Sequence, residues 1–358
     1  MMFNIACNTT TTKNKLLGDK LMNYKLLPAA IAAATVMASS ANAGDIVTYG
    51  KINLSYVQDE QNDNSGTTDD AELKTASSRI GFKGSEDLGE KLKVIYKLEY
   101  QVVPDGEGTE FKGRNSYVGL QGGLGTIIAG EHDTPLKMSS KPVDVFNDYH
   151  YADIAYSIYG ERREQDIIMY KTPAVGAYTA TIAVMPGNDT DAGSDDNGFT
   201  DQISAAVTYQ ADNLYVAIAG DQNVGGVDTV RLSGSYQLGN LKLGALIQKS
   251  DLSDGYDLKL KSDSPLAKLT SDADEQRSYV LSADYTIDQW VLKAQVVDAT
   301  NVGPTDEVDS SAMSIGVDYK LSKRTKLYSY YSELNVDIEN AEDYEYTAKG
   351  VVGIEHKF

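Results

Sequence analysis

The sequence predicts an all-β fold, an antiparallel up-and-down β-barrel of about sixteen strands that crosses a membrane. The first observation behind this prediction is that apolar and polar residues alternate in segments of roughly ten residues. The second is a composition of 24 Tyr and 31 Gly with only 8 Pro, which is typical of β-structure. The third is that short and long breaks alternate between the segments, as they must in a barrel with one elaborated rim.

The first 43 residues are expected to be absent from the folded protein. Residues 22–43 have a Lys near their start, an apolar run over 26–37 and the sequence Ala-Asn-Ala at 41–43, which is the layout of a signal peptide. The apolar run is too short for a helical membrane span of about 20 residues. Residues 1–21 are polar and precede an internal Met22, so we interpret them as an extension from an over-long gene start. The barrel is therefore expected over 44–358.

The expected mature chain is acidic and contains no cysteine. Residues 1–43 hold Cys7, four Lys and one Asp, so 44–358 carry 28 basic and 51 acidic residues, a net charge of −23. Without cysteine, disulfides and thiol chemistry are excluded. Nucleic acid is also disfavoured as a partner, because its affinity depends on Lys and Arg that neutralise phosphates.

The strand pattern continues from one end of the chain to the other. Leu241, Leu243, Ala245 and Ile247 alternate with residues of the opposite face, and segments of this length suit a tilted strand that crosses a hydrocarbon layer. Seven short breaks and eight long ones separate sixteen such segments. The long breaks are 59–75, 104–110, 132–162, 186–199, 222–227, 250–275, 299–309 and 336–346. Closure into a barrel is required because an open sheet edge in lipid leaves backbone groups unpaired.

Several motifs are similar to those of the general diffusion porins of Gram-negative bacteria. The stretch 75–89, with Arg79-Ile-Gly-Phe-Lys, resembles the second strand, turn and third strand of that family. Residues 114–120 resemble its fourth strand, and 125–135 its fifth strand with the exit into the third loop. Further matches are 168–173, 316–325 and the closing 353–358. Any one motif is weak, but six in the family's order are a strong signal.

The resemblance implies a sixteen-stranded barrel in the outer membrane of a Gram-negative bacterium, usually a homotrimer. It implies a water-filled channel through which small hydrophilic solutes and ions diffuse passively, without a catalytic step or a cofactor. The third loop, here within 132–162, is expected to fold into the lumen and narrow it. Lipopolysaccharide, outer-membrane lipid and the barrel assembly machinery are the other expected partners.

A channel that discriminates by charge needs fixed charges that face one another across a narrow, wet gap. The basic side is expected from wall residues that match the family's basic cluster. The alternation of side chains along a strand supports a lumen-facing Arg79, because Ile80 and Phe82 on the opposite face would contact lipid. The same argument supports a lumen-facing Lys51. The predicted basic wall is Lys51, Arg79, Arg114, Arg163 and Lys97. Arg162 could replace Arg163, because a slip of one residue exchanges the two faces of a strand.

The acidic side is expected from the loop, with Asp144 and Asp148 as the first candidates and Asp133 and Asp153 as alternatives. Glu131 stands where the family often has a basic residue, and it would weaken the positive side if it faced the lumen. Together with the net charge, this favours a cation-preferring channel. Charges on distant loops contribute little, because salt screens them within about 8–10 Å.

No enzyme signature accompanies these features. His132, His150 and His356 have no metal-ligand spacing, and no Ser, His and acid arrangement stands out. The alternatives that stay open are a substrate-selective channel for sugar, phosphate or organic acid, an outer-membrane enzyme, and a soluble secreted β-sandwich. Tyr149, Tyr151, Tyr156 and Tyr159 keep open an aromatic path for a selective channel.

The last strand ends on an aromatic residue. Ile354, His356 and Phe358 share one face of it, and nothing structural requires an aromatic side chain at the final position. The pattern resembles the signal by which the outer-membrane assembly machinery recognises barrel proteins. These three residues are therefore the predicted assembly signal.

Overall fold

The computed structural model describes residues 46–63, 66–106, 108, 111–186, 198, 200–252, 275–300, 308–338 and 344–358. The predicted extension 1–21 and signal peptide 22–43 lie outside the described residues. No helix among the described residues is long and apolar enough to cross a membrane. The strands are β1 (Val47–Asp63), β2 (Gly66–Thr75), β3 (Arg79–Gly89), β4 (Leu92–Gln101), β5 (Ser116–Gly122), β6 (Gly125–Asp133), β7 (Arg163–Lys171), β8 (Tyr178–Met185), β9 (Gln202–Ala211), β10 (Leu214–Gln222), β11 (Val227–Leu238), β12 (Leu241–Leu252), β13 (Glu275–Ile287), β14 (Trp290–Thr300), β15 (Val308–Lys320), β16 (Thr325–Ile338) and β17 (Tyr344–Lys357).

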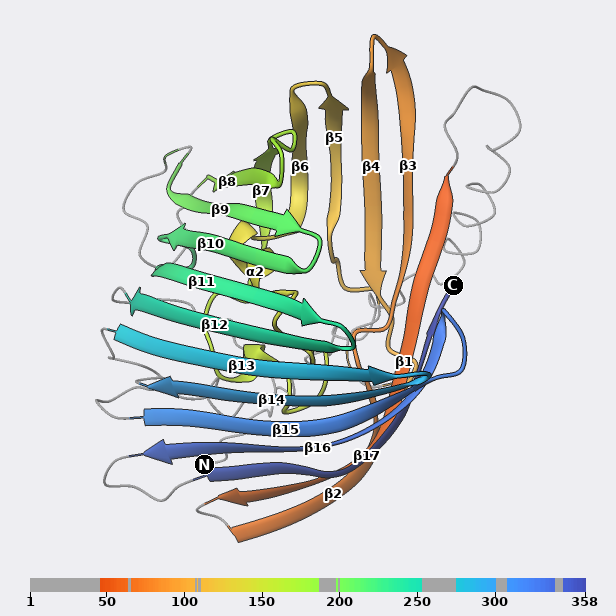
Figure 1. Cartoon of the computed structure of the whole chain (residues 1–358), viewed down its shortest axis with the longest axis vertical. Helices are drawn as coiled ribbons and strands as arrows, with labels where there is room; N and C mark the ends of the chain where they lie inside the picture. The colour runs from red at the N-terminus through yellow and green to blue at the C-terminus, as the bar shows by residue number, and fades with distance from the viewer. Residues whose placement is uncertain are drawn as a thin grey trace, which may run out of the picture. The chain divides into compact units, whose positions relative to one another are not determined.

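The strands form one closed antiparallel sheet. From β3 to β17 each strand pairs with the next along the chain, and β17 pairs with β1 over most of its length. Figure 1 shows this succession of strands in chain order. The predicted barrel is confirmed, because the pairing of the first strand with the last leaves the wall without an open seam between them.

The seventeen strands occupy sixteen positions in the wall. β2 pairs with residues 54–63 of β1, and β3 pairs with residues 47–51 of the same strand. The chain bends between β2 and β3 at Ala76–Ser78, where Ser77 has a positive φ of 52°. The predicted long break at 59–75 is wrong, because β1 and β2 form a hairpin there. Its polar residues lack the apolar face that marks the other strands, so the pattern did not reveal it.

Side chains alternate between a buried polar face and an exposed apolar face. In β11, Thr229, Arg231 and Ser233 are buried, whereas Val230 and Leu232 between them are exposed. This is the pattern of a membrane barrel, whose apolar band faces lipid and whose interior is polar.

The closing strand ends on an aromatic ring that covers a glycine. The backbone N–H of Phe358 donates to Gly50 O (3.1 Å), and the Gly50 N–H donates to Phe358 O (3.0 Å). A Cβ on Gly50 would lie 2.2 Å from the Phe358 ring, so only glycine leaves room for the ring. Ile354 and Phe358 are exposed on the apolar face, with His356 between them.

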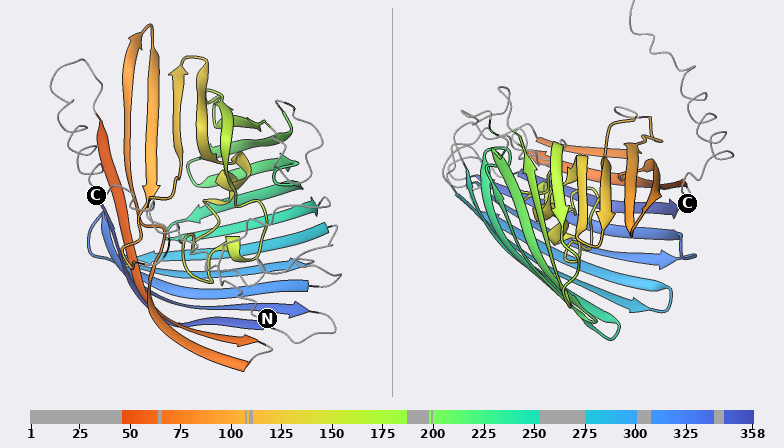
Figure 2. Two further views of the ribbon diagram at one scale, coloured as in Figure 1. Left: turned by 180° about the vertical axis from the view of Figure 1, so that it is seen from behind. Right: turned by 90° about the horizontal axis from the view of Figure 1, so that it is seen from above.

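Residues 134–162, called the inner loop below, lie on the concave side of the sheet in both views of Figure 2. The loop begins with α2 (Pro135–Ser140), capped by Thr134, whose hydroxyl accepts from the Lys137 N–H (3.1 Å). It also contains the short 3₁₀ turn η2 (Ile154–Tyr156). Fully buried apolar side chains of the loop, among them Phe146, form one cluster with inward-facing apolar side chains of the sheet such as Leu334 and Val336.

Candidate functional site

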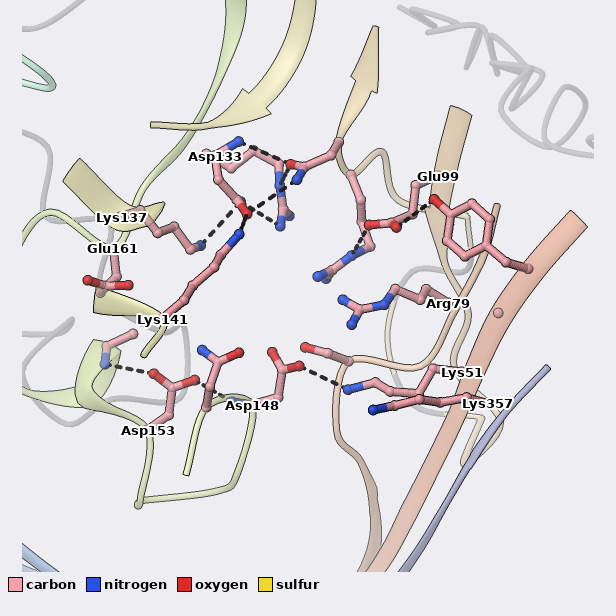
Figure 3. A pocket seen from close by; sticks show the side chains of 18 of the residues that line it. Lys51, Arg79, Glu99, Asp133, Lys137, Lys141, Asp148, Asp153, Glu161 and Lys357 are labelled. Carbon is pink, nitrogen blue, oxygen red and sulfur yellow. Dashed lines mark hydrogen bonds and ion pairs between the residues drawn. The ribbon is translucent and has the colours of Figure 1, made fainter. Parts of the chain in front are cut away.

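A cavity of about 790 Å³ lies between the inner loop and the wall formed by β1, β3, β4 and β6. Charged side chains dominate its lining, and we call it the charged cavity. Its basic residues are Lys51, Arg79, Lys97, Arg114, Lys137, Lys141, Arg163 and Lys357, and its acidic residues are Glu99, Asp133, Asp148, Asp153 and Glu161. Figure 3 shows the labelled members of this set around an open centre. All five basic residues predicted from the sequence line this cavity.

Arg79 is the basic residue that the wall presents most freely. It lies opposite Lys51 in the β1–β3 pairing, so both side chains point to the same face of the sheet. The Arg79 guanidinium is directed toward the open centre in Figure 3. It makes no hydrogen bond or ion pair with any described residue. Glu99 acts on this guanidinium only through an electrostatic interaction without direct contact, so Arg79 presents a positive charge to the open centre.

Glu99 organises the next part of the wall. Its carboxylate accepts hydrogen bonds from the Tyr49 hydroxyl (2.8 Å) and from Arg114 Nε (3.1 Å), and Lys97 Nζ lies 3.1 Å away. One carboxylate thus holds two basic side chains and leaves a net positive charge. The sequence reasoning missed Glu99, although it shares a strand face with Lys97 two residues earlier.

Asp133 belongs to this basic wall and not to the acidic side predicted for it. It is the last residue of β6, and its carboxylate lies 2.9 Å from Arg163, 3.2 Å from Lys141 and 3.6 Å from Lys137. Asn115 donates a further hydrogen bond to it (3.2 Å). Lys137 and Lys141 escaped the sequence reasoning, because their place depends on α2 bringing both lysines back to the strand that precedes it.

The acidic side of the cavity comes from the turn at Asp148 in the inner loop. The Asp148 carboxylate accepts a hydrogen bond from Lys51 Nζ at 2.9 Å, which Figure 3 marks across the cavity. Asp148 has a positive φ of 74°, which is rare for a residue other than glycine. The turn is held by Asp153, whose side chain accepts from the backbone N–H groups of Asp148 (2.7 Å) and Ala155 (2.8 Å).

Two predicted acidic residues lie elsewhere. Asp144 is buried behind the cavity lining, where its carboxylate accepts from the Phe146 N–H (3.1 Å). Burial raises the pKa of Asp144 well above its usual value, and the nearby carboxylates of Asp153 and Glu161 add to this effect. Glu131 lines a separate cavity of about 400 Å³, which shares Arg163 with the charged cavity. A bulge in β6 between Gly130 and His132 accounts for this displacement, because it breaks the parity of the strand.

The buried end of the inner loop is held by a residue that the sequence did not single out. Arg231 on β11 is fully buried and donates to the Glu161 carboxylate (2.6 Å), Leu136 O (3.1 Å) and Tyr159 O (3.0 Å). Burial raises the pKa of Glu161, against the opposing effect of the Arg231 charge. The signal in the sequence that could have identified Arg231 is a basic residue among the otherwise uncharged inward-facing residues of β11.

The charged cavity is suited to the passage or binding of polar solutes. Opposite charges at its edges create a transverse field, and fixed charges in a narrow polar space discriminate between ions. The described residues contain no group of three or more His, Cys, Asp or Glu side chains placed to hold a metal ion.

Comparison with known proteins places these features among outer-membrane proteins. Residues 29–339 match the family described as Gram-negative porin. The major outer membrane protein P.IB of Neisseria gonorrhoeae is 28% identical over 207 residues, 56% of this chain and 57% of that protein. The P.IA protein of a Neisseria meningitidis serogroup A strain is 26% identical over 340 residues, 78% of this chain and 81% of that protein. The chain thus spans little more than half of the first relative.

Solved structures share the fold at lower sequence identity. An anion-selective porin from Comamonas acidovorans is 23% identical with a TM-score of 0.67, over 88% of this chain and all of that one. OmpF of Salmonella typhi is 17% identical with a TM-score of 0.65, over 88% of this chain and 98% of that one. OmpT of Vibrio cholerae, solved in a trimer form, is 15% identical with a TM-score of 0.62, over 88% of this chain and all of that one.

Proposed function

The chain belongs to the Gram-negative porin family of the outer membrane, and from that premise we propose that it is a channel for passive diffusion of small hydrophilic solutes and ions. The observation that carries this proposal is the charged cavity itself. Its walls come from a closed barrel and its other side from the inner loop, and charges of both signs line it. Such a lining supports a water-filled path narrowed by the loop and gives no support to a catalytic step.

For ion preference, the lining charges favour anions. Eight basic residues face five acidic ones, and Arg79 makes no side-chain hydrogen bond or ion pair among the described residues. The Comamonas acidovorans neighbour is described as anion-selective. The cation preference expected from Glu131 and the overall charge stays untested, but Glu131 lies outside this cavity and distant charges are screened by salt. We therefore infer a preference for anions.

A substrate-selective channel is the second candidate, and Arg79 favours its anionic forms. A guanidinium binds phosphate and carboxylate oxygens in a forked geometry, so phosphate or a small organic acid suits this site better than a neutral sugar. Saturating inhibition of ion current by phosphate, absent in an Arg79→Gln variant, would separate this candidate from a general pore.

The remaining expectations concern assembly. A homotrimer is supported by the neighbour solved in a trimer form, and lipopolysaccharide is expected to surround it. The signal peptide over 22–43 is expected to direct export and to be cleaved after Ala43, which leaves the barrel free to enter the outer membrane. The exposed face of Ile354, His356 and Phe358 is expected to be the signal that the assembly machinery reads.

The proposal is tested by recording from purified protein in planar bilayers. Stepwise conductance is expected, with a reversal potential in a KCl gradient that shows anion preference. Arg79→Gln should shift that potential toward cations, whereas Arg324→Gln, in an exposed turn, should leave it unchanged. Absence of conductance steps would contradict the channel, and a cation-selective parent would contradict the inferred preference alone.

A further inference from the structure

The tip of the inner loop, directly after the cavity-lining residue Asp148, meets the wall at strands β14, β15 and β16. The contact centres on Tyr149, a buried residue next to Asp148. Its ring lies 4.8 Å from that of Tyr328 and 5.1 Å from that of Tyr330. Burial raises the pKa of Tyr149, so its hydroxyl is neutral and takes part in hydrogen bonds only.

Lys293 on β14 approaches this ring from the wall. Its ammonium group lies 4.5 Å from the ring centre of Tyr149 and 4.7 Å from that of Phe146, within the range of a cation–π interaction. It also donates a hydrogen bond to the backbone oxygen of Val145 (3.0 Å). Lys293 is buried and absent from the lining of the charged cavity, so its contacts are with the loop and with Asp318.

Lys326 on β16 supplies the second contact with Tyr149. Its ammonium group donates to the Tyr149 hydroxyl (2.8 Å) and lies 5.3 Å from the ring centre. Asp318 on β15 lies between the two lysines, 3.4 Å from Lys293 and 2.9 Å from Lys326. Asp318 is shared by the two lysines, while Glu355 interacts electrostatically with Lys326 and Asp144 with Lys293. The aromatic faces and the loop carbonyl add to the stabilisation of the buried Lys293 ammonium and the partly exposed Lys326 ammonium.

Tyr149 affects the charged cavity through Asp148, the adjacent residue, which lines that cavity. Asp148 has a backbone conformation with positive φ, which persists only when surrounding contacts hold it in place. On one side these contacts come from Asp153, and on the other from the packing of Tyr149. The carboxylate placed in this way bonds Lys51 across the cavity.

We propose that Lys293, Lys326 and Asp318 form a clamp on Tyr149 that holds Asp148 beside Lys51, so that the two lysines are positioning residues for the selectivity of the pore. The inference rests on the proposed channel function. It assigns a role in ion selection to residues that are absent from the lining of the charged cavity.

The sign of the selectivity change distinguishes this role from a direct electrostatic one. If Lys293 acted only through its charge, Lys293→Met would make the lumen more negative and shift the reversal potential toward cations. If the clamp operates, loss of Lys293 releases Asp148, Lys51 keeps only its longer ion pair with Glu355 (3.7 Å), and the shift is toward anions. Asp148→Asn gives the reference size for that anion-directed shift.

The experiment measures reversal potential and open-channel noise for Lys293→Met, Lys326→Met, Asp148→Asn and the combination of Lys293→Met with Asp148→Asn. We expect each single variant to shift toward anions and the combination to shift no further than Asp148→Asn. Lys293→Arg should retain parental selectivity, because its charge and ring contacts remain. Lys242→Met is the matched control, since Lys242 pairs with Asp284 (3.9 Å) and makes no described contact with the inner loop.

A cation-directed shift, additive effects in the combination, or parental selectivity in both methionine variants would each overturn the clamp. Folded barrels are recognised by their altered mobility in unheated SDS. If Lys293→Met fails to fold, Tyr149→Phe tests the clamp through its other lysine, because it removes only the hydroxyl to which Lys326 donates. Absence of conductance in the parent would refute the channel itself, so the two failures are distinguishable.

Discussion

Replacement of Arg231 by methionine should detach the inner loop while leaving the barrel wall intact. Arg231 is 0% exposed, and its guanidinium satisfies one carboxylate and two backbone carbonyls of the loop. Methionine fills much of the same volume but donates no hydrogen bond. The substitution therefore leaves the Glu161 carboxylate buried without its cation.

The size of the effect follows from the buried pair. Removal of one partner of a buried ion pair costs about 3–5 kcal/mol. Since each 1.4 kcal/mol changes an equilibrium tenfold, the detached loop should become roughly 10² to 4 × 10³ times more populated. The strands of the wall keep their backbone pairing, so the cost falls on docking of the loop.

Hydrogen exchange measured by mass spectrometry on the purified barrel reads this change directly. Peptides within 134–162 should exchange faster by about the factor given above, because exchange of a docked loop follows its local opening. Peptides from β12 to β16 should exchange as in the parent. Bilayer recordings of the same variant should show noisier open channels.

A matched double variant separates charge from packing. Arg231→Met combined with Glu161→Gln leaves no ion buried without a partner, and removal of both members of a buried pair is often close to neutral. Its exchange should therefore be slower than that of Arg231→Met alone. Parental exchange in Arg231→Met, or faster exchange in the double variant, would refute the reasoning.

Three further predictions concern other parts of the chain. Because the pKa of Asp144 is raised in the docked loop, docking of the loop is strongest at low pH and weakens as pH rises through that pKa. Hydrogen exchange of the loop, corrected for the intrinsic pH dependence of the exchange rate, should therefore rise with pH in the parent. It should rise less in Asp144→Asn. Deletion of Phe358 should lower the amount of barrel in the outer membrane while the inserted channels keep parental conductance, and unchanged membrane levels would count against its role in assembly. Gly50→Val should reduce the folded yield seen in unheated SDS, because its Cβ would meet the Phe358 ring at 2.2 Å and such overpacking costs about 1–3 kcal/mol.

The wall of the barrel was predictable because its physics is local. A strand between lipid and lumen must alternate, and Lys51 and Arg79 could be placed on the inner face from their apolar neighbours alone. The hairpin at 59–75 escaped prediction for the same reason. Its strands bear polar residues on both faces, so no alternation marks them.

The charged cavity was only partly predictable, because its loop side depends on tertiary contacts. Asp144 and Asp148 are equivalent in sequence terms, yet one is buried and the other faces Lys51. What separates them is the turn capped by Asp153 and the packing of Tyr149, which join residues from distant strands. Glu131 does not lie at its predicted position because of the bulge in β6, and no pattern in the sequence indicates this bulge.

The most direct test of the central claim, that ions pass Arg79 at a constriction formed by the inner loop, uses Arg79→Cys. The chain has a single cysteine, Cys7, which lies in the segment expected to be removed, so the variant carries one thiol in the barrel. Attachment of a negatively charged thiol reagent should lower single-channel conductance and move the reversal potential toward cations. Asp288→Cys, in an exposed turn, is the control and should show neither change. Unaltered conductance and reversal potential after complete modification of Cys at position 79 would contradict the account.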